Sequence, residues 1–356
     1  MRRNSKSIRI GNIGIGGSNP ITIQSMTNTR AADIAGTIAQ IHSLEEAGCE
    51  IIRMAVPREE DAVIFSAAKE AGCRIPLVAD IHFDYRIALE SIRRGADKIR
   101  INPGNIGESW KVAEVANACK TAGVPIRIGV NSGSLDKKLL EKYGSPTPEA
   151  LAESALSQAE ILENFGFSDI VISIKSSTVQ SMIEACRIVA GQSEYPLHLG
   201  VTEAGDAYSG MVKNAIGIGT LLSEGIGDTI RVSLTADPAE EIRAAREILR
   251  ALQLDHRGGV DIVSCPTCGR TCIDLIGLQS QCRESLSKLD TKGKLLKVAI
   301  MGCVVNGPGE AREADYGIAG GDGNGLVFKK GEILRKVPEN ELVKALLGEI
   351  IKDLNT

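Results

Sequence analysis

The sequence predicts an α/β protein, a (β/α)8 TIM barrel followed by a smaller α+β domain. Two observations predict the barrel: eight short, apolar, β-branched runs recur before Ala236, and helix patterns separate them. A third predicts the second domain, because this alternation stops there and shorter, mixed elements follow. The polar stretch 255–259 is the expected boundary, dividing a domain of residues 1–255 from one of residues 256–356.

The eight runs define the expected barrel strands. They are ITIQSMT at 21–27, EIIRMAV at 50–56, IPLVADIH at 75–82, DKIRINP at 97–103, PIRIGVN at 125–131, DIVISIK at 169–175, PLHLGVTEAG at 196–205 and DTIRVSLT at 228–235. Between them, segments such as 35–48 and 109–123 repeat apolar residues every three or four positions and end in glycine, which is typical of helices. The glycine-rich stretch 11–17 lies well before the first of these, so we expect a turn in an N-terminal hairpin and not the phosphate loop of a doubly wound sheet.

The second domain follows a helix pattern at 237–254. Its expected elements are strands at 260–266, 297–303, 316–321 and 325–331, and helices at 273–286 and 339–354. Because helices separate only some of these strands, the pattern predicts an antiparallel or mixed sheet.

Composition excludes several classes of protein. The chain is 43% hydrophobic and 24% charged, which favours a globular protein with a large core. A net charge of −4 argues against nucleic acid as the main partner. We find neither a signal-peptide pattern nor an apolar run of roughly 18 residues, so we expect a cytoplasmic protein without membrane contact. Nine cysteines, an odd number, indicate reduced thiols, some of them metal ligands.

Three cysteines follow two of the expected strands in the second domain. Cys265 and Cys268 form a C-x-x-C pair, and Cys303 opens a glycine-rich loop that ends at Glu310. A C-x-x-C pair alone suits zinc, a redox disulfide or an iron–sulfur cluster. Structural zinc requires four nitrogen or sulfur ligands, yet no Cys or His follows Cys303. The pattern predicts a [4Fe–4S] cluster on the three thiols, with Glu310 as an exchangeable fourth ligand.

Cys272 provides the main alternative within this site. It comes four residues after Cys268, on what we expect to be the following helix, so a closed cluster with four cysteines remains open at this point. The remaining cysteines lie in or beside helix patterns and are expected to be small core residues: Cys49, Cys73, Cys119, Cys186 and Cys282.

Polar side chains recur towards the C-terminal ends of the barrel strands, where barrel enzymes hold their active sites. They are Gln24, Thr27, Arg53, Asp80, His82, Arg100, Asn102, Arg127, Asn131, Lys175, Glu203, Arg231 and Ser233. A single arginine among them could be a buried ion pair of the barrel interior. Together, the cations exceed what Asp80 and Glu203 can neutralise, so we expect a multiply charged anion, and a diphosphate offers the paired oxygens that arginine binds.

Seven motifs carry a resemblance to a known family. They are IQSMTNT at 23–29, ADIHFD at 79–84, KIRINPGNIG at 98–107, RIGVNSGSL at 127–135, HLGVTEAG at 198–205, SCPTCGRT at 264–271 and MGCVVNGPGE at 301–310. With these motifs the chain closely resembles the 4-hydroxy-3-methylbut-2-enyl diphosphate synthases, the iron–sulfur enzymes of the methylerythritol phosphate route to isoprenoids, in their bacterial two-domain form. The first motif is also similar to the dihydropteroate synthase barrel, so the later motifs matter more.

The resemblance implies an activity. It is the two-electron reductive opening of 2-C-methyl-D-erythritol 2,4-cyclodiphosphate, with loss of water, using electrons from flavodoxin or ferredoxin. It also implies a homodimer whose sites each combine one chain's barrel with the other chain's cluster domain. The alternative from a different class is a non-catalytic iron–sulfur regulatory or scaffold protein that binds a phosphorylated metabolite. Glu310 favours the enzyme, because a fourth thiol would serve a structural cluster better than a labile carboxylate.

The resemblance also implies roles for individual residues. The cluster ligands fall on Cys265, Cys268, Cys303 and Glu310, which leaves Cys272 outside the set. The residues that bind the diphosphate fall on Arg53, Arg100, Arg127, Asn131 and Lys175. Glu203 matches the acidic residue near the substrate hydroxyl and is the expected proton donor. Close to the substrate we further expect Asp80, Arg231, Ser233 and Asn306.

Overall fold

The protein is described here by a computed structural model, which covers residues 2–303 and 311–355 and divides into two compact units, Met1–Leu252 and Gln253–Thr356. The first unit contains eight parallel strands: β3 (Thr22–Met26), β4 (Ile51–Ala55), β5 (Leu77–Asp80), β6 (Lys98–Ile101), β7 (Ile126–Asn131), β8 (Ile170–Lys175), β9 (His198–Leu199) and β10 (Thr229–Ile230). They form one sheet in the order β8-β7-β6-β5-β4-β3-β10-β9. A parallel bridge between Ile172 and Leu197 joins its two edges and closes the barrel. The predicted (β/α)8 barrel is therefore confirmed.

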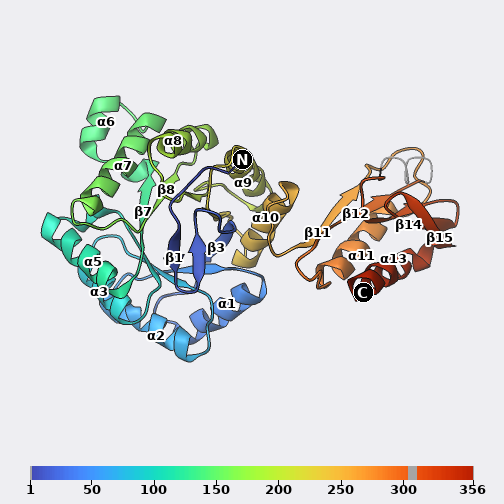
Figure 1. Ribbon diagram of the computed structural model, residues 1–356, viewed down its shortest axis with the longest axis horizontal. Coiled ribbons are helices and arrows are strands. Elements are labelled where there is room, and N and C mark those ends of the chain that lie inside the picture. Colours follow the sequence, from blue (N-terminus) through green and yellow to red (C-terminus); the bar gives the residue numbers. More distant parts are fainter. Residues whose placement is uncertain (1, 304–310, 356) are drawn as a thin grey trace. The chain divides into compact units, whose positions relative to one another are not determined.

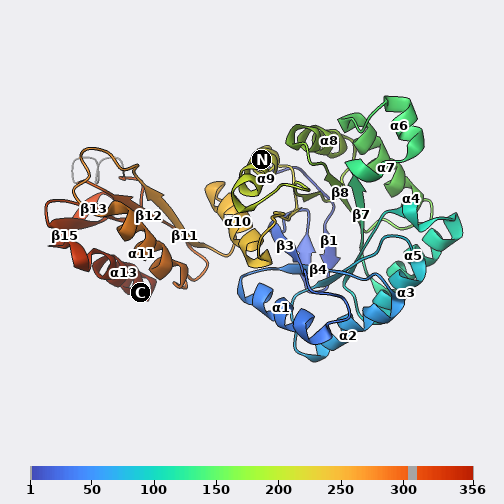
Figure 2. The same ribbon diagram turned by 180° about the vertical axis from the view of Figure 1, so that it is seen from behind.

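Helices surround this barrel on all sides (Figures 1 and 2). They are α1 (Ile34–Glu46), α2 (Val63–Glu70), α3 (Tyr85–Arg93), α4 (Pro103–Ile106), α5 (Ser109–Ala122), α6 (Lys137–Tyr143), α7 (Pro148–Glu163), α8 (Val179–Gln192), α9 (Ala207–Ser223) and α10 (Pro238–Ala251), with short 3₁₀ turns η1 (Glu59–Ala62) and η2 (Ser132–Ser134). Local sequence sets several of their ends. Asp33 caps α1 by accepting a hydrogen bond from the Gly36 amide at 2.9 Å, and α5 stops at Gly123, whose φ of 67° favours glycine.

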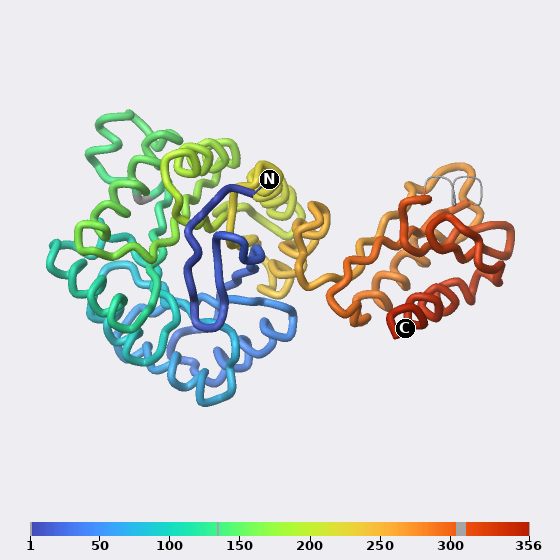
Figure 3. Tube along the Cα trace, in the orientation of Figure 1, coloured from blue at the N-terminus to red at the C-terminus, as the bar shows by residue number. Residues whose placement is uncertain are grey.

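An N-terminal hairpin closes one end of the barrel (Figure 3). Its strands β1 (Ile8–Ile10) and β2 (Ile13–Ile15) pair antiparallel across a turn at Gly11, where φ is 54°. This confirms the hairpin predicted from the glycine-rich stretch. Its isoleucines join one apolar cluster with residues from the beginnings of three barrel strands: Ile8, Ile10, Ile15, Ile51, Val78 and Val171. The polar strand ends therefore lie at the opposite, C-terminal mouth of the barrel.

Two barrel strands are shorter than the sequence predicts. β9 and β10 have two residues each, although apolar runs extend over 196–205 and 228–235. Just beyond β9 the backbones approach closely, because a Cβ at Gly200 would lie 2.4 Å from the carbonyl oxygen of Arg231. Glu203 then adopts a φ of 53°, which turns the chain away from the strand direction.

The second unit is a mixed sheet with helices, as predicted. Its strands are β11 (Gly259–Ser264), β12 (Leu295–Met301), β13 (Tyr316–Gly320), β14 (Asn324–Lys329) and β15 (Glu332–Pro338), and its described helices are α11 (Leu275–Ser287), α13 (Leu342–Leu354) and the 3₁₀ turn η3 (Glu339–Glu341). β11, β12 and β13 are parallel, whereas β14 and β15 continue the sheet antiparallel. The helices α11 and α13 pack against the sheet in one apolar cluster that includes Leu278, Ile318 and Leu346.

The sequence did not predict β15. Its residues are almost all exposed, so it lacks the alternation of buried and polar positions that marks a strand with one buried face. Within the described residues, no helix is both long enough and apolar enough to cross a membrane.

Candidate active site

Two arginines at the mouth of the barrel share one carboxylate. Asp80, at the end of β5, lies between Arg53 on β4 and Arg100 on β6. Arg100 Nη1 is 3.1 Å from Asp80 Oδ1, and Arg53 Nε is 3.6 Å from Asp80 Oδ2. Burial by itself raises the pKa of Asp80, but the charges of Arg53 and Arg100 outweigh burial, so its pKa is lowered and Asp80 is ionised. One negative charge therefore faces two positive charges.

Two further cations have no such carboxylate partner among the described residues. Arg127 on β7 is 1% exposed, and its Nε and Nη1 atoms have no hydrogen-bond partner in the described part of the chain. Lys175, at the end of β8, is 8% exposed, and no ion pair links it to any carboxylate within residues 2–303 and 311–355. Burial, together with Arg53 and Arg100, lowers the pKa of Arg127, yet a guanidinium keeps its proton in proteins. An unneutralised charge is thus buried at the barrel mouth, where an anion would stabilise it.

Arg231 differs from the other cations because a carboxylate from a helix holds it. Arg231 Nη2 lies 3.2 Å from Glu241 Oε1, and Glu241 also accepts hydrogen bonds from the Ser25 hydroxyl at 3.0 Å and the Leu234 amide at 3.1 Å. Sequence reasoning missed Glu241, because position 241 in the first turn of an amphipathic helix resembles an ordinary surface position. The nearby Ser233 is half-buried, and its carbonyl accepts a hydrogen bond from Asn214.

The remaining predicted site residues of the barrel follow strands that end at the same mouth, whereas two predicted residues of the second unit are not described. Asn131 ends β7 in register with Lys175 on β8. Glu203 is exposed, and its φ of 53° is a conformation that residues other than glycine rarely adopt and that is found disproportionately at functional sites. The predicted residues Asn306 and Glu310 lie outside the described residues.

Gly129 gives Arg100 its place beside β7. A Cβ at Gly129 would lie 2.5 Å from Arg100 Nε and 2.7 Å from Arg100 Nη2, which is closer than such atoms can approach. The guanidinium of Arg100 therefore lies across the glycine backbone while it reaches Asp80. Sequence reasoning noted the motif 127–135 but assigned no role to this glycine.

The sequence leads us to expect that Arg100 contacts a bound diphosphate. Gly129→Ala should then weaken this binding at least tenfold, because Arg100 must move and one charge-assisted contact is worth roughly 1.5–3 kcal/mol. The measurement is the KM for the substrate, with kcat as the comparison. Gly219→Ala is the matched control, because its added Cβ meets nothing within 4 Å. An unchanged KM in Gly129→Ala would show that Arg100 does not contact the anion.

The thiol-bearing loops of the second unit meet each other. Ser264 pairs with Ile300, so Cys265 and Cys303 follow neighbouring parallel strands. The Gly302 amide donates a hydrogen bond to Cys265 Sγ at 3.3 Å. Amide donors to sulfur are among the features that tune iron–sulfur clusters, and three thiols on two adjacent loops are a donor set that suits such a cluster. Among the described residues, no three His, Cys, Asp or Glu side chains converge closely enough to hold a metal ion.

Cys272 is not on a helix, which corrects the sequence-based expectation. Helix α11 begins only at Leu275, because Asp274 caps it by accepting a hydrogen bond from the Gly277 amide at 3.0 Å. Cys272 lies in the preceding loop, where its amide donates to the Gly302 carbonyl at 3.3 Å. It is exposed, like Cys268.

Four of the remaining cysteines are core residues, as expected. Cys49, Cys119, Cys186 and Cys282 are buried, and burial raises the pKa of Cys49, Cys186 and Cys282 to about 12. Their thiols therefore stay protonated, whereas a metal ligand must lose its proton. Cys73 is half-buried, and burial also raises its pKa.

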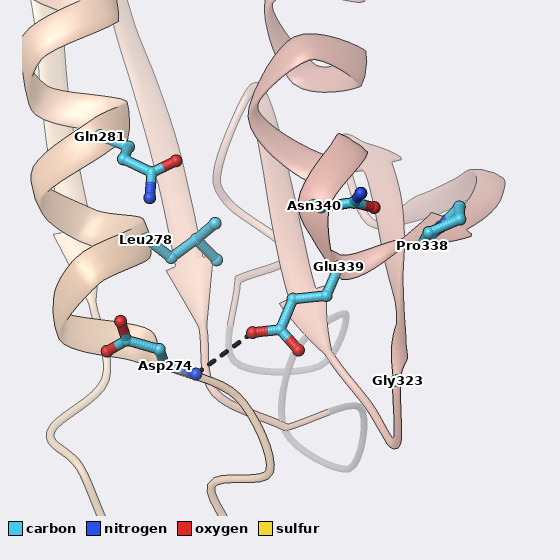
Figure 4. A pocket seen from close by; sticks show the side chains of 7 residues that line it. All are labelled: Asp274, Leu278, Gln281, Gly323, Pro338, Glu339 and Asn340. Atoms are coloured by element: carbon cyan, nitrogen blue, oxygen red, sulfur yellow. Dashed lines mark hydrogen bonds between the residues drawn. The ribbon is translucent and has the colours of Figure 1, made fainter.

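A pocket of about 420 Å³ lies elsewhere in the second unit (Figure 4). It is lined by Asp274, Leu278, Gln281, Gly323, Pro338, Glu339 and Asn340. Glu339 Oε1 accepts a hydrogen bond from the Asp274 amide at 3.2 Å, which ties the start of α11 to η3. Carboxylates and amides line this pocket, so it does not suit a phosphorylated ligand.

These features define a class of protein: a TIM barrel with buried cations at its mouth, followed by a domain that carries thiols on neighbouring loops. Two family descriptions match the chain: the GcpE TIM-barrel domain over residues 5–246 and the GcpE protein C-terminal domain over residues 261–352. The chain therefore belongs to the GcpE family.

Curated relatives are similar to this chain along its full length. The 4-hydroxy-3-methylbut-2-en-1-yl diphosphate synthase (flavodoxin) of Fusobacterium nucleatum is 55% identical over 99% of both chains. The enzymes of the same name from Caldanaerobacter subterraneus and Clostridium perfringens are each 58% identical, covering 99% and 97% of this chain and 98% of their own. The alternative of a non-catalytic protein is thus not favoured, because these relatives are enzymes.

Two solved structures of low sequence identity share the barrel fold. Dihydropteroate synthase from Stenotrophomonas maltophilia aligns with a TM-score of 0.52 at 13% identity, covering 70% of this chain and 99% of its own. The Thermus thermophilus enzyme aligns with a TM-score of 0.51 at 14% identity, covering 70% and 98%. At such identities the likeness shows the fold alone.

Proposed function

We propose that this chain catalyses the reaction of its family, with the barrel cations holding the substrate. That reaction converts 2-C-methyl-D-erythritol 2,4-cyclodiphosphate to 4-hydroxy-3-methylbut-2-enyl diphosphate, by reductive ring opening with loss of water, on the route to isoprenoids. The observation that carries the proposal is the buried, unneutralised charge of Arg127 and Lys175 beside Arg53 and Arg100. A cyclic diphosphate supplies the negative charge that these residues require.

The barrel residues divide into two tasks. Arg53, Arg100, Arg127 and Lys175 bind and orient the diphosphate, with Asn131 beside them, because their donors come from four different strands and fix its oxygens from several sides. Asp80 and Arg231 adjust the net charge around the bound substrate, and Ser233 and Asn306 are further residues that contact the substrate. Glu203, held in a strained backbone conformation, donates the proton to the departing hydroxyl.

The second unit would hold the redox cofactor. Cys265, Cys268 and Cys303 hold a [4Fe–4S] cluster, with Glu310 as the fourth, exchangeable ligand. When bound, this group supplies the two electrons of the ring opening. The amide of Gly302 stabilises the thiolate of Cys265 by its hydrogen bond. The names of the relatives support flavodoxin as the electron donor, with ferredoxin as the alternative.

A homodimer completes this proposal. Two large aromatic side chains are exposed beyond strands β5 and β9, Phe83 at 72% and Tyr208 at 82%. Exposed aromatic residues are frequent where another protein surface docks. We propose that the second unit of a partner chain covers this mouth and excludes water from the substrate.

Turnover is the test of the proposed function. Anaerobically purified, iron-loaded protein, supplied with the cyclic diphosphate and reduced flavodoxin, should form the allylic diphosphate. If protein with full iron content gives no product with either flavodoxin or ferredoxin, the proposed reaction is wrong.

Arg127→Met should separate stability from function. Methionine fills a similar volume without the buried, unpartnered donors, so we expect the free energy of unfolding to rise by about 1–3 kcal/mol. Binding of the substrate should weaken at least tenfold, because a charge-assisted contact is lost. Urea unfolding and substrate titration measure the two effects.

The control for this variant is Arg86→Met, which removes an exposed arginine of α3 that pairs with Asp84. It should change neither substrate binding nor stability by more than about 0.5 kcal/mol. A destabilised Arg127→Met protein with normal binding would show that Arg127 serves the fold and not the anion.

A further inference from the structure

A buried lysine lies in the barrel interior below the proposed anion site. Lys98, the first residue of β6, is 0% exposed and lies one inward-facing position before Arg100. Its Nζ donates a hydrogen bond to Gln24 Oε1 on β3 at 3.3 Å. In the sheet order, β4 and β5 separate β6 from β3, so the side chain of Lys98 reaches across the barrel. No residue role assigned so far includes Lys98.

The surroundings of Lys98 are rich in donors and poor in acceptors. Three charged or titratable side chains of the barrel strands interact electrostatically with Lys98: Arg53 on β4, Arg127 on β7 and His198 on β9. Asp80 on β5, Arg100 on β6 and Lys175 on β8 also belong to the barrel strands. Asp80 is engaged by Arg53 and Arg100. Within the described residues, no carboxylate forms an ion pair with Lys98, and Gln24 Nε2 and His198 Nε2 are buried without partners.

We propose that Lys98 is a positioning residue of the anion site, and that its Nζ takes up a proton when a diphosphate binds above it. The proton comes from solvent, and no other bond forms or breaks. This inference rests on the proposed diphosphate site.

Electrostatics gives the physical reason. Burial, with the charges of Arg127 and Arg53, lowers the pKa of Lys98 well below its ordinary value. A diphosphate at the mouth offsets the charges of these arginines, so the pKa of Lys98 rises on binding. At pH values between the two pKa values, binding takes up a proton, and affinity falls as the pH rises through that window. The ammonium form in turn adds positive charge beneath the anion and keeps its hydrogen bond to Gln24.

Calorimetric titration of full-length, iron-loaded protein with inorganic diphosphate at several pH values from about 6 to 9 tests this inference. The heat in two buffers of different ionisation enthalpy gives the number of protons taken up per ligand bound. At the pH where the wild-type protein takes up most protons, we expect Lys98→Met to take up fewer protons, by at most about one per ligand bound. Protonation changes of the ligand, Lys175 and His198 contribute to both proteins, so the difference isolates Lys98.

Two further variants make the test specific. Lys69→Met removes an exposed lysine of α2 that pairs with Asp97, and it should leave proton uptake unchanged. Lys98→Arg carries a permanent charge, so it should bind diphosphate without the proton uptake of Lys98. If Lys98→Met does not fold, the proton uptake of Lys98→Arg is compared with that of the wild-type protein instead.

The possible results separate the two proposals. Equal proton uptake in the wild-type, Lys98→Met and Lys98→Arg proteins would overturn the role of Lys98 and leave the diphosphate site standing. A wild-type protein that does not bind diphosphate would overturn both.

Discussion

Replacing Cys268 by alanine should leave the protein without its iron and without turnover. Cys268 is exposed at a turn that its own amide closes by donating to the Thr271 hydroxyl at 3.2 Å, so the substitution should not disturb the fold. The proposed cluster would lose one of three thiolates, and a cluster held by two thiolates is labile. We expect iron content to fall from about four per chain to near zero. Iron analysis and the visible spectrum of anaerobically purified protein measure the effect.

Cys272→Ala is the matched control for this prediction. Cys272 is also exposed, lies four positions further along the same loop and contacts Gly302 through its backbone, which alanine retains. Its iron content and turnover should therefore equal those of the unaltered protein. If Cys272→Ala loses the iron and Cys268→Ala keeps it, the cluster has a different set of ligands.

The sequence was sufficient to predict the barrel and the second domain, because the burial of each strand and helix determines its pattern of apolar residues. Strands such as β7 and β8 are almost wholly buried, so they appear as short runs rich in isoleucine and valine between amphipathic helices. The same reasoning fails where burial is absent or where backbones approach each other. β15 is exposed and has no apolar periodicity, and β9 ends at Leu199, directly before Gly200 lies against the backbone at Arg231.

The sequence predicted the excess positive charge of the candidate site, but not the contacts that hold its side chains in place. An excess of arginine and lysine at strand ends is visible in the sequence, and the structure brings Arg53, Arg100 and Asp80 into contact. Lys98 was missed because its neighbours in the sequence do not show whether a strand lysine points into the barrel or out to solvent. Glu241 was missed because a helix glutamate that binds Arg231 looks the same in the sequence as one exposed to water. Only the closure of the barrel brings these side chains to their partners.

Mixing two inactive variants should restore activity if each site combines two chains. The reason lies in where the chain leaves the barrel. Helix α10 begins at the mouth, where Glu241 contacts the Leu234 amide, and its 14 residues run back about 20 Å along the barrel. The first unit therefore ends at Leu252, away from the mouth. A compact domain attached there would reach the mouth of a second chain more readily than its own, and two-fold symmetry satisfies both chains.

The two variants are Arg127→Met, with a defective barrel and intact thiols, and Cys268→Ala, with an intact barrel and no cluster. They are mixed in equal amounts and assayed at a substrate concentration too low to occupy the weakened barrel site of Arg127→Met, so that each variant alone is nearly inactive. After random subunit exchange, half of the dimers contain one chain of each kind. In every such dimer, one site combines both defects, and the other joins the intact barrel to the intact cluster domain. We expect about a quarter of the activity of the unaltered protein. Sites formed within one chain would each keep one defect, so a fully exchanged mixture that stays inactive would show that barrel and cluster come from the same chain.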